Sequence, residues 1–306
     1  MRVFALSVAT LLMSASFAFA DVKVVASIKP IHSLVASVMQ GVGTPALIVD
    51  GNASPHTYNM KPSDAATLEQ AQVIFWVGHE LEAFLEKPIE ALGGKAEAVS
   101  LMDIKGIAKL AMREDENFAA HEDEQEEGGE HHHEGMDGHI WLDPENAKAI
   151  LKTVAETLSK ADPANATIYA ANSDKTSASI DALSAEIVVT LAPVRGQGFL
   201  VFHDAYHYFE KRFDIAASGA LSINPENPPG AEAIVKLKKK IADGEIKCVF
   251  SEPQFDDKLT QLLLEGSTVK AAVLDPEGAQ LSTGPGLYFE LLKNMSGSLK
   301  DCLSGT

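Results

Sequence analysis

Short apolar runs that alternate with helix-like segments constrain the fold of this chain more than any other feature. The apolar runs cover residues 22–28, 46–49, 73–77, 199–203, 247–251 and 271–274. Runs of this kind suit strands that are buried on both faces of a parallel sheet, whereas half-exposed strands alternate apolar and polar residues. Segments typical of helices lie between them, at 31–40, 62–71, 81–92, 231–242 and 256–265. The alternation predicts an α/β fold.

The middle of the chain predicts two helices, one over residues 146–161 and a longer one over 163–191. Residues 164–191 contain neither Gly nor Pro, and Asp162 followed by Pro163 is a helix start signal. A helix over 163–191 would be ~43 Å long at 1.5 Å per residue. We therefore predict two lobes with parallel β-sheets flanked by helices, joined by a rigid linker helix. The predicted boundaries are 21–161 for the N-terminal lobe, 162–192 for the linker and 193–306 for the C-terminal lobe.

Residues 1–20 have the features of a secretory signal peptide. Arg2 supplies the basic start, residues 3–13 are apolar, and Ala18-Phe19-Ala20 matches a small-x-small cleavage site. The apolar run is shorter than the ~20 residues of a membrane-spanning helix. The sequence therefore predicts cleavage before Asp21 and export of the mature protein.

Cys248 and Cys302 are the only two cysteines. An exported protein can form disulfides, so one bridge between them is the simplest interpretation. Two separate buried thiols are the alternative. A cysteine-based metal site is disfavoured because no further cysteine is present.

The charge of the chain is strongly acidic and unevenly distributed. The net charge is −18, which argues against a nucleic-acid partner because phosphate backbones require clustered Lys and Arg. Residues 114–137 hold eleven Asp or Glu and no Lys or Arg, together with His121, His131, His132 and His133. This composition predicts a disordered, exposed loop whose histidines are auxiliary metal ligands. A solvating acidic loop with incidental histidines is the alternative.

Four motifs place a potential metal ligand within or just after an apolar run. The four residues are His56, His139, His203 and Asp275. Ligands of parallel α/β sheets bind at the carboxyl ends of the strands, so two ligands from each half would converge between the lobes. Three imidazoles and one carboxylate suit tetrahedral Zn²⁺. A single histidine after a strand is more often structural, and spacing alone leaves that alternative open.

The residues around these histidines resemble a known family. The matching pieces occur in order over nearly the whole mature chain, at 27–34, 54–58, 61–64, 138–144, 202–206, 224–226, 229–230 and 251–254. They include Ser54-Pro55-His56-Thr57-Tyr58 and Gly138-His139-Ile140-Trp141-Leu142-Asp143-Pro144. Together they resemble the metal-binding receptors of bacterial ABC importers, specifically the ZnuA type.

The resemblance implies a periplasmic receptor that binds Zn²⁺ between two α/β lobes and performs no chemistry on it. It implies delivery of zinc to an ABC permease with its cytoplasmic ATPase, and we expect a monomer. It assigns ligand roles to His56, His139 and His203, and Asp275 matches the family's carboxylate. Manganese members typically carry Glu where this chain has His203, which favours zinc. Asp204 and Glu252 are expected to orient imidazoles.

Other interpretations use the same residues differently. A manganese or iron receptor of the same fold is one, and an exported zinc-dependent hydrolase is another. A metal buffer or adhesin would need only the acidic histidine loop. Among the remaining histidines, His207 is expected to be a surface or structural residue, and His32 is expected to pack near the start of a helix.

Overall fold

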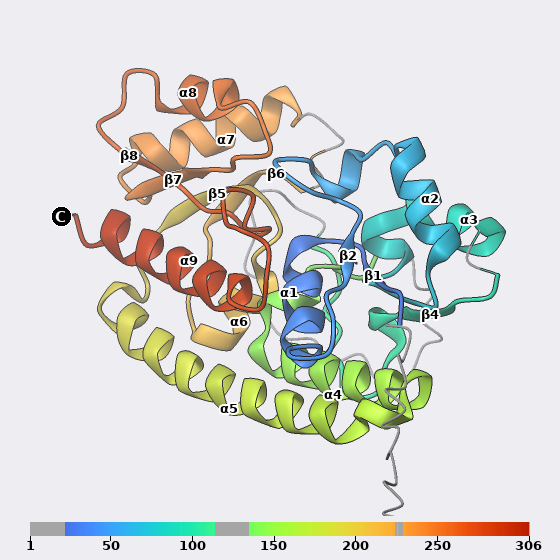
Figure 1. Cartoon of the computed structure of the whole chain (residues 1–306). Helices are drawn as coiled ribbons and strands as arrows, with labels where there is room; N and C mark the ends of the chain where they lie inside the picture. Colours follow the sequence, from blue (N-terminus) through green and yellow to red (C-terminus); the bar gives the residue numbers. More distant parts are fainter. Residues whose placement is uncertain (1–21, 93, 114–134, 224, 226–228, 306) are drawn as a thin grey trace, which may run out of the picture.

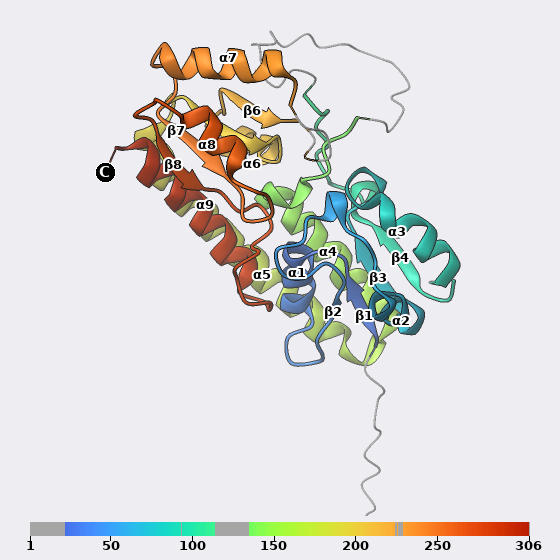
Figure 2. The same ribbon diagram turned by 90° about the horizontal axis from the view of Figure 1, so that it is seen from above.

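The computed structural model describes residues 22–92, 94–113, 135–223, 225 and 229–305, which form two α/β lobes. The N-terminal lobe, in blue to teal, lies beside the C-terminal lobe, in orange to red (Figures 1 and 2). The predicted signal peptide and most of the predicted acidic loop lie outside the described residues.

The N-terminal lobe contains a parallel four-stranded sheet in the order β2-β1-β3-β4. Its strands are β1 (Val24–Ala26), β2 (Ala46–Leu47), β3 (Val73–Trp76) and β4 (Glu97–Ser100). Its helices are α1 (Lys29–Val38), α2 (Pro62–Gln70), α3 (His79–Leu92) and α4 (Pro144–Ala161). Short 3₁₀ helices are η1 (Pro55–Thr57), η2 (Leu101–Asp103) and η3 (Ile140–Leu142).

The C-terminal lobe repeats the same strand order, as β6-β5-β7-β8, again all parallel. Its strands are β5 (Phe199–His203), β6 (Gly219–Ser222), β7 (Cys248–Ser251) and β8 (Lys270–Val273). Its helices are α6 (His207–Phe213), α7 (Ala231–Ala242), α8 (Lys258–Leu264) and α9 (Leu287–Leu303). The chain changes direction across the sheet between β5 and β7, a switch point at which open α/β sheets bind ligands. His203 is the last residue of β5, at this point.

The predicted α/β class with two parallel sheets is confirmed, but four elements were not predicted. The edge strand β4 exposes Glu97 and Ala98, so it carries no continuous apolar run. The strand β6 is short and includes Gly219 and Ser222. The helix α6 directly follows the His203 motif, and α9 contains Ser and Gly near its C-terminal end that weaken a helical pattern.

A long helix runs beneath both lobes (Figure 1). It is α5 (Ala166–Leu191), continued by the 3₁₀ turns η4 (Pro163–Asn165) and η5 (Ala192–Val194). By length and apolar composition alone this segment would suffice to cross a membrane. Its buried residues, which include Ile180 and Leu183, instead face a bundle with α1, α4 and α9. The predicted linker helix is therefore packed along its length against both lobes.

The start of the linker differs in detail from the prediction. The Asp162 side chain does not cap the helix but accepts hydrogen bonds from Asn165 Nδ2 at 2.6 Å and the Tyr169 hydroxyl at 2.9 Å. The two side chains thus fix the turn through which α4 enters α5.

One hydrophobic core extends through both lobes. It includes Ile31 of α1, Ile150 of α4, Leu183 of α5 and Leu292 of α9. A second, smaller cluster lies between the C-terminal sheet and helices α7 and α8. Because the main core is continuous, opening the lobes widely would expose apolar surface, which costs ~25 cal/mol per Å².

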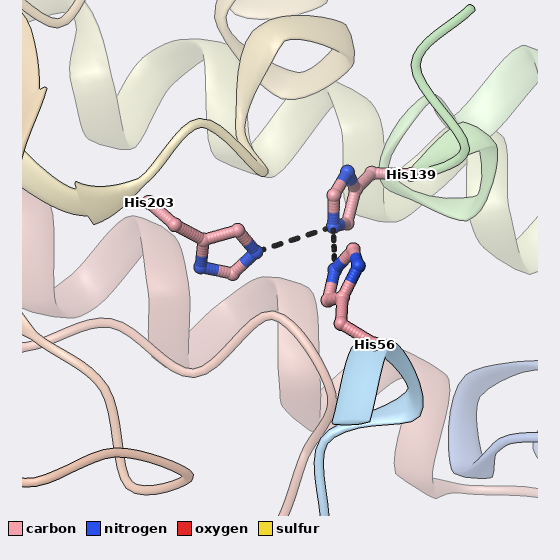
Figure 3. A group of neighbouring side chains, drawn as sticks. All are labelled: His56, His139 and His203. Atoms are coloured by element: carbon pink, nitrogen blue, oxygen red, sulfur yellow. Dashed lines mark hydrogen bonds between the residues drawn. The ribbon is translucent and has the colours of Figure 1, made fainter. Parts of the chain in front are cut away.

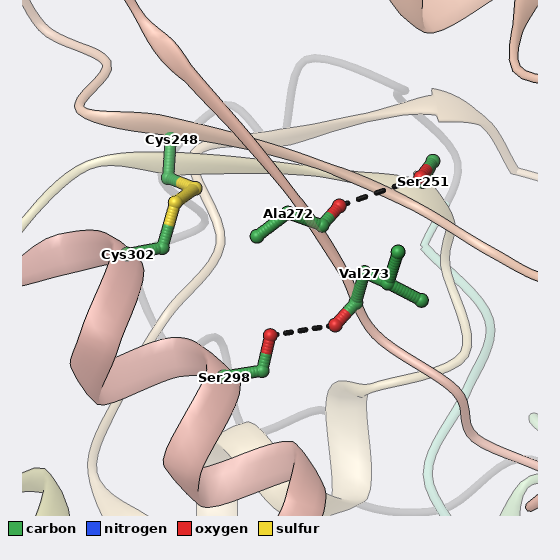
Figure 4. The surroundings of a disulfide bond; sticks show 6 residues. All are labelled: Cys248, Ser251, Ala272, Val273, Ser298 and Cys302. Atoms are coloured by element: carbon green, nitrogen blue, oxygen red, sulfur yellow. Dashed lines mark hydrogen bonds between the residues drawn. A yellow bond between two sulfur atoms is a disulfide. The ribbon is translucent and has the colours of Figure 1, made fainter.

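A disulfide joins Cys248 of β7 to Cys302 of α9, as predicted (Figure 4). Both residues are buried. Close by, the Ser298 hydroxyl of α9 donates a hydrogen bond to the Val273 carbonyl of β8 at 2.6 Å. The bridge therefore fastens the C-terminal helix to the second sheet.

Replacing Cys248 and Cys302 together by Ala should lower the free energy of unfolding by about 4 kcal/mol, because the bridge closes a long loop in the unfolded chain. Urea unfolding of metal-free protein, followed by circular dichroism, measures this. Wild-type protein in reducing agent should match the variant. A variant as stable as oxidised wild type would contradict the prediction.

Candidate metal centre

Three histidines from separate parts of the chain meet between the lobes (Figure 3). His139 Nε2 lies 3.3 Å from His56 Nε2 and 3.3 Å from His203 Nε2. The ligand atoms of all three residues lie within 4.8 Å of one another. His139 and His203 are buried, and His56 is partly exposed.

A tight turn after β2 positions His56. The Ser54 hydroxyl accepts the His56 backbone N–H at 3.3 Å, and Pro55 begins the 3₁₀ helix η1. The next residue but one, Tyr58, anchors the turn because its hydroxyl donates to Asp64 Oδ2 at 2.8 Å and its ring packs on Phe84. Among the residues that the structure describes, no carboxylate contacts the His56 ring, so this side chain is positioned through its backbone.

His139 is held by a carboxylate from two residues earlier. Asp137 Oδ1 accepts the His139 backbone N–H at 2.9 Å and lies 2.7 Å from His139 Nδ1. Both side chains are buried. The ring also packs near Trp141, whose Nε1 donates to the Pro276 carbonyl of the other lobe at 2.8 Å. Asp137 therefore fixes the Nδ1–H tautomer and turns Nε2 toward the centre.

His203 is held in the same manner from the opposite lobe. Its Nδ1 lies 2.8 Å from Glu252 Oε1 and 2.7 Å from Oε2, and the Glu252 side chain is fully buried. Glu252 directly follows β7, which neighbours β5 in the sheet. The expectation that Glu252 orients an imidazole agrees with this contact, which leaves Nε2 of His203 as the atom directed at the centre.

The Nδ1–H tautomers of His139 and His203 favour cation binding at the centre. With Nδ1–H donated to Asp137 and Glu252, the Nε2 atoms of His139 and His203 each present a lone pair, and these oppose each other at 3.3 Å. Two acceptors at this separation repel unless a positive ion lies between them. Tetrahedral Zn²⁺, with Zn–N bonds of about 2.0–2.1 Å, sets its ligand nitrogens about 3.4 Å apart. The donor set and the two spacings of 3.3 Å around His139 Nε2 therefore fit zinc.

The structure does not bring Asp275 into this group. Its Oδ1 accepts hydrogen bonds from the backbone N–H of Glu277 at 3.2 Å and of Gly278 at 2.9 Å, and from Gln254 Nε2 at 3.0 Å. These contacts close the turn that follows β8. In this conformation Asp275 stabilises its own turn, and the group of candidate ligands consists of three histidines.

Asp204 and His207 occupy positions beside the centre. The sequence led us to expect that Asp204 orients an imidazole, but in the structure Asp204 Oδ1 pairs with Arg113 Nη1 at 3.2 Å. Burial raises the pKa of Asp204 to about 7, although the positive charge of Arg113 opposes the shift. Burial and Arg113 lower the pKa of His207 to about 4, and His207 is not part of the three-histidine group.

The sequence analysis also predicted roles for His32 and for the histidines of the acidic loop. His32 is buried and its Nε2 lies 3.1 Å from the Pro45 carbonyl, which agrees with a packing role. The loop histidines His121, His131, His132 and His133 lie outside the described residues.

Asp137 is the functional residue that the sequence analysis missed. It was assigned to the end of the acidic loop, but Gly135–Asp137 are described and Met136 pairs with Ala111 in an antiparallel bridge. The signal was present as a carboxylate two residues before a candidate ligand, in Asp137-Gly138-His139. The surrounding run of acidic residues concealed it.

His56 should titrate well below the ordinary imidazole pKa of 6.5 in metal-free protein. Burial, followed by repulsion from His139 and His203, disfavours its charged form. As the pH falls below 6.5 the unfolded chain takes up this proton first, so the group makes the folded state less stable with falling pH. An NMR titration of the His56 ring measures the midpoint.

The matched variant for this titration is His139→Ala/His203→Ala, in which the His56 midpoint should move up toward 6.5. A wild-type midpoint at or above 6.5 would contradict the prediction.

Comparisons with known proteins place the chain in a family. The family model described as "ZnuA: Zinc-uptake complex component A periplasmic" matches residues 24–302. The chain is 47% identical over 305 residues to the "High-affinity zinc uptake system protein ZnuA" of Brucella suis biovar 1, covering 92% of this chain and 91% of that protein. It is 32% identical over 308 residues to the protein of the same name from Yersinia pestis, covering 98% and 96%.

Solved structures share the fold. The "Periplasmic zinc binding protein TroA from Treponema pallidum" superposes with a TM-score of 0.78 at 20% identity, covering 93% of this chain and 99% of that chain. A "Crystal structure of ZnuA" superposes with a TM-score of 0.77 at 23% identity, covering 92% and 99%. Because the family model spans most of the chain and the sequence relatives cover it almost completely, this chain belongs to the ZnuA family of periplasmic zinc-uptake components.

Proposed function

We propose that this protein is a periplasmic receptor that binds Zn²⁺ with high affinity and delivers it to an ABC permease for zinc uptake. The observation that carries the proposal is the pair of buried carboxylates, Asp137 and Glu252, that aim the Nε2 lone pairs of His139 and His203 at one point. The names of the relatives, which are zinc uptake proteins, support the same conclusion.

The proposed ligands are His56, His139 and His203. A structural zinc site is fully enclosed by four protein ligands, whereas a transported ion must be released. Three imidazoles with His56 partly exposed leave one side of the ion open to water or to a further ligand. Asp275 is retained as a candidate fourth ligand from the sequence, and it would have to leave its contacts with Gln254, Glu277 and Gly278 to bind.

The proposal extends to parts of the chain outside the described residues. Residues 1–20 are proposed to be the signal peptide that directs export to the periplasm. His121, His131, His132 and His133 are proposed to capture zinc with lower affinity and supply it to the centre. The mature protein is proposed to act as a monomer, and the permease to work with a cytoplasmic ATPase.

The chemistry of the centre disfavours the alternatives. A manganese site would use more oxygen ligands than three imidazoles provide. A zinc hydrolase needs a general base beside the metal-bound water. Asp137 and Glu252 contact the ligand rings at Nδ1, on the opposite side of each ring from the centre. Neither carboxylate is therefore placed to act as this base.

Replacing His56, His139 and His203 together by Ala should abolish tight zinc binding, because all three imidazole ligands would be lost. Calorimetric titration of metal-stripped mature protein measures this. Deletion of residues 114–134 should leave the tight site intact, and this deletion is chosen to end before Gly135 so that Asp137 stays in place. Tight binding that survives the triple substitution and disappears with the deletion would make the protein a metal buffer.

Glu252→Gln and Asp137→Asn should each weaken zinc affinity by about 10–100-fold, because each keeps the shape of the side chain but loses the charge that orients and polarises a ligand imidazole. Competition with a fluorescent zinc chelator measures the change. Glu265→Gln, at an exposed position remote from the centre, is the matched control. Affinities of Glu252→Gln and Asp137→Asn equal to that of the control would contradict the prediction.

A further inference from the structure

Two chain segments that flank residues 114–134 pair just before His139. Met112 N donates to the Gly135 carbonyl at 2.6 Å, Asp137 N donates to the Leu110 carbonyl at 2.9 Å, and Ala111 bridges Met136. We call residues 110–113 and 135–137 the neck. Its second segment ends at Asp137, the carboxylate that holds His139. Any movement of the neck therefore reaches the His139 ring through one hydrogen bond.

Helix α6 of the C-terminal lobe contacts both segments of the neck. The buried Tyr208 hydroxyl donates to the Asp137 carbonyl at 2.9 Å and accepts the Leu110 N–H at 3.0 Å. Arg113, the last described residue of the first segment, donates from Nη2 to Glu210 Oε2 at 2.6 Å. The neck is thus formed by segments of the N-terminal lobe, but its hydrogen bonds to Tyr208 and Glu210 attach it to α6 of the C-terminal lobe.

Arg113 also reaches the residue next to a proposed ligand. Its Nη1 lies 3.2 Å from Asp204 Oδ1, and Asp204 directly follows His203. The Asp204 and Glu210 side chains are only 4% and 5% exposed. Because both nearly buried carboxylates pair with one guanidinium, loss of Arg113 would leave two buried acidic groups without that cation. The neck and the segment after β5 would then separate or rearrange.

We propose that Arg113 is a positioning residue for the metal centre. It fastens the neck, which carries the partner of His139, to the segment that follows His203. It thereby fixes the separation of two ligands that come from different lobes. The proposal rests on the proposed zinc-binding function of the three histidines. The proposal predicts that loss of Arg113 disturbs the metal centre, whereas loss of another ion pair between the lobes does not.

Arg212 offers a matched control for this role. It also lies on α6, and it forms two hydrogen bonds across the lobes, to Asp143 Oδ1 at 2.7 Å and Oδ2 at 2.8 Å. Asp143 caps α4, and it is not one of the carboxylates, Asp137 and Glu252, that contact ligand rings. Removing Arg212 therefore tests the general effect of losing an ion pair between α6 and the N-terminal lobe.

The experiment compares Arg113→Met, Arg113→Lys and Arg212→Met in the full mature protein. Zinc dissociation is timed by stopped-flow transfer to a chelator, the visible absorption of Co²⁺-loaded protein reports the ligand geometry, and thermal unfolding of metal-free protein reports stability. Arg113→Met should speed zinc release by about 10–100-fold and alter the Co²⁺ spectrum. Arg113→Lys should recover part of the loss, because an ammonium is a point charge that cannot span two carboxylates as the guanidinium fork does.

Arg212→Met should lower thermal stability while leaving zinc release and the Co²⁺ spectrum unchanged. Wild-type zinc release and spectrum in Arg113→Met would overturn the proposal, as would equal effects of Arg113→Met and Arg212→Met on zinc release. If Arg113→Met does not fold, Tyr208→Phe removes the second contact between α6 and the neck, and unchanged zinc release in that variant would also overturn it. Wild-type protein that binds no zinc would instead refute the proposed function.

Discussion

The opposed lone pairs of His139 and His203 are the feature on which the rest of this structure depends. Imidazole nitrogens at 3.3 Å with both lone pairs inward repel one another, and each is held there by a buried carboxylate, Asp137 or Glu252. The two carboxylates come from different lobes. The fold must therefore keep the lobes in register to within a fraction of an ångström, or the ligand set is lost.

The architecture provides that register by packing. The core continues from one lobe into the other through α1, α4, α5 and α9, and α5 runs along both. Polar contacts reinforce it, since Lys29 of α1 donates to three carbonyls of the 278–281 segment in the other lobe. Such an interface suits a binding site that changes shape little, in contrast to lobes connected by a flexible hinge.

Much of the fold and part of the centre were accessible from sequence, for physical reasons that differ. Buried parallel strands need apolar side chains on both faces, so runs such as 73–77 and 199–203 were visible. An edge strand does not need apolar side chains on both faces. The strand β4, in which Glu97 and Ala98 are exposed, was therefore not predicted. The ligand histidines were identified because the residues around them resemble those of a known family, whereas spacing alone left a structural role open. Of the two carboxylates that orient ligand rings, Glu252 was expected from the sequence, but Asp137 was missed because it lies in an acidic run. Asp204 was also expected to orient an imidazole, but it pairs with Arg113.

By itself the sequence determined the α/β class and the linker helix, made a bridge between Cys248 and Cys302 the simplest interpretation, and singled out the three histidines that can meet. These follow from local periodicity, from the presence of only two cysteines and from motif resemblance. Only the tertiary structure decided that Asp275 closes its own turn, that Asp137 holds His139, and that Arg113 connects the neck to α6. Those choices depend on which donors and acceptors lie within about 3 Å after packing. That information exists only once residues far apart in the chain have been brought together.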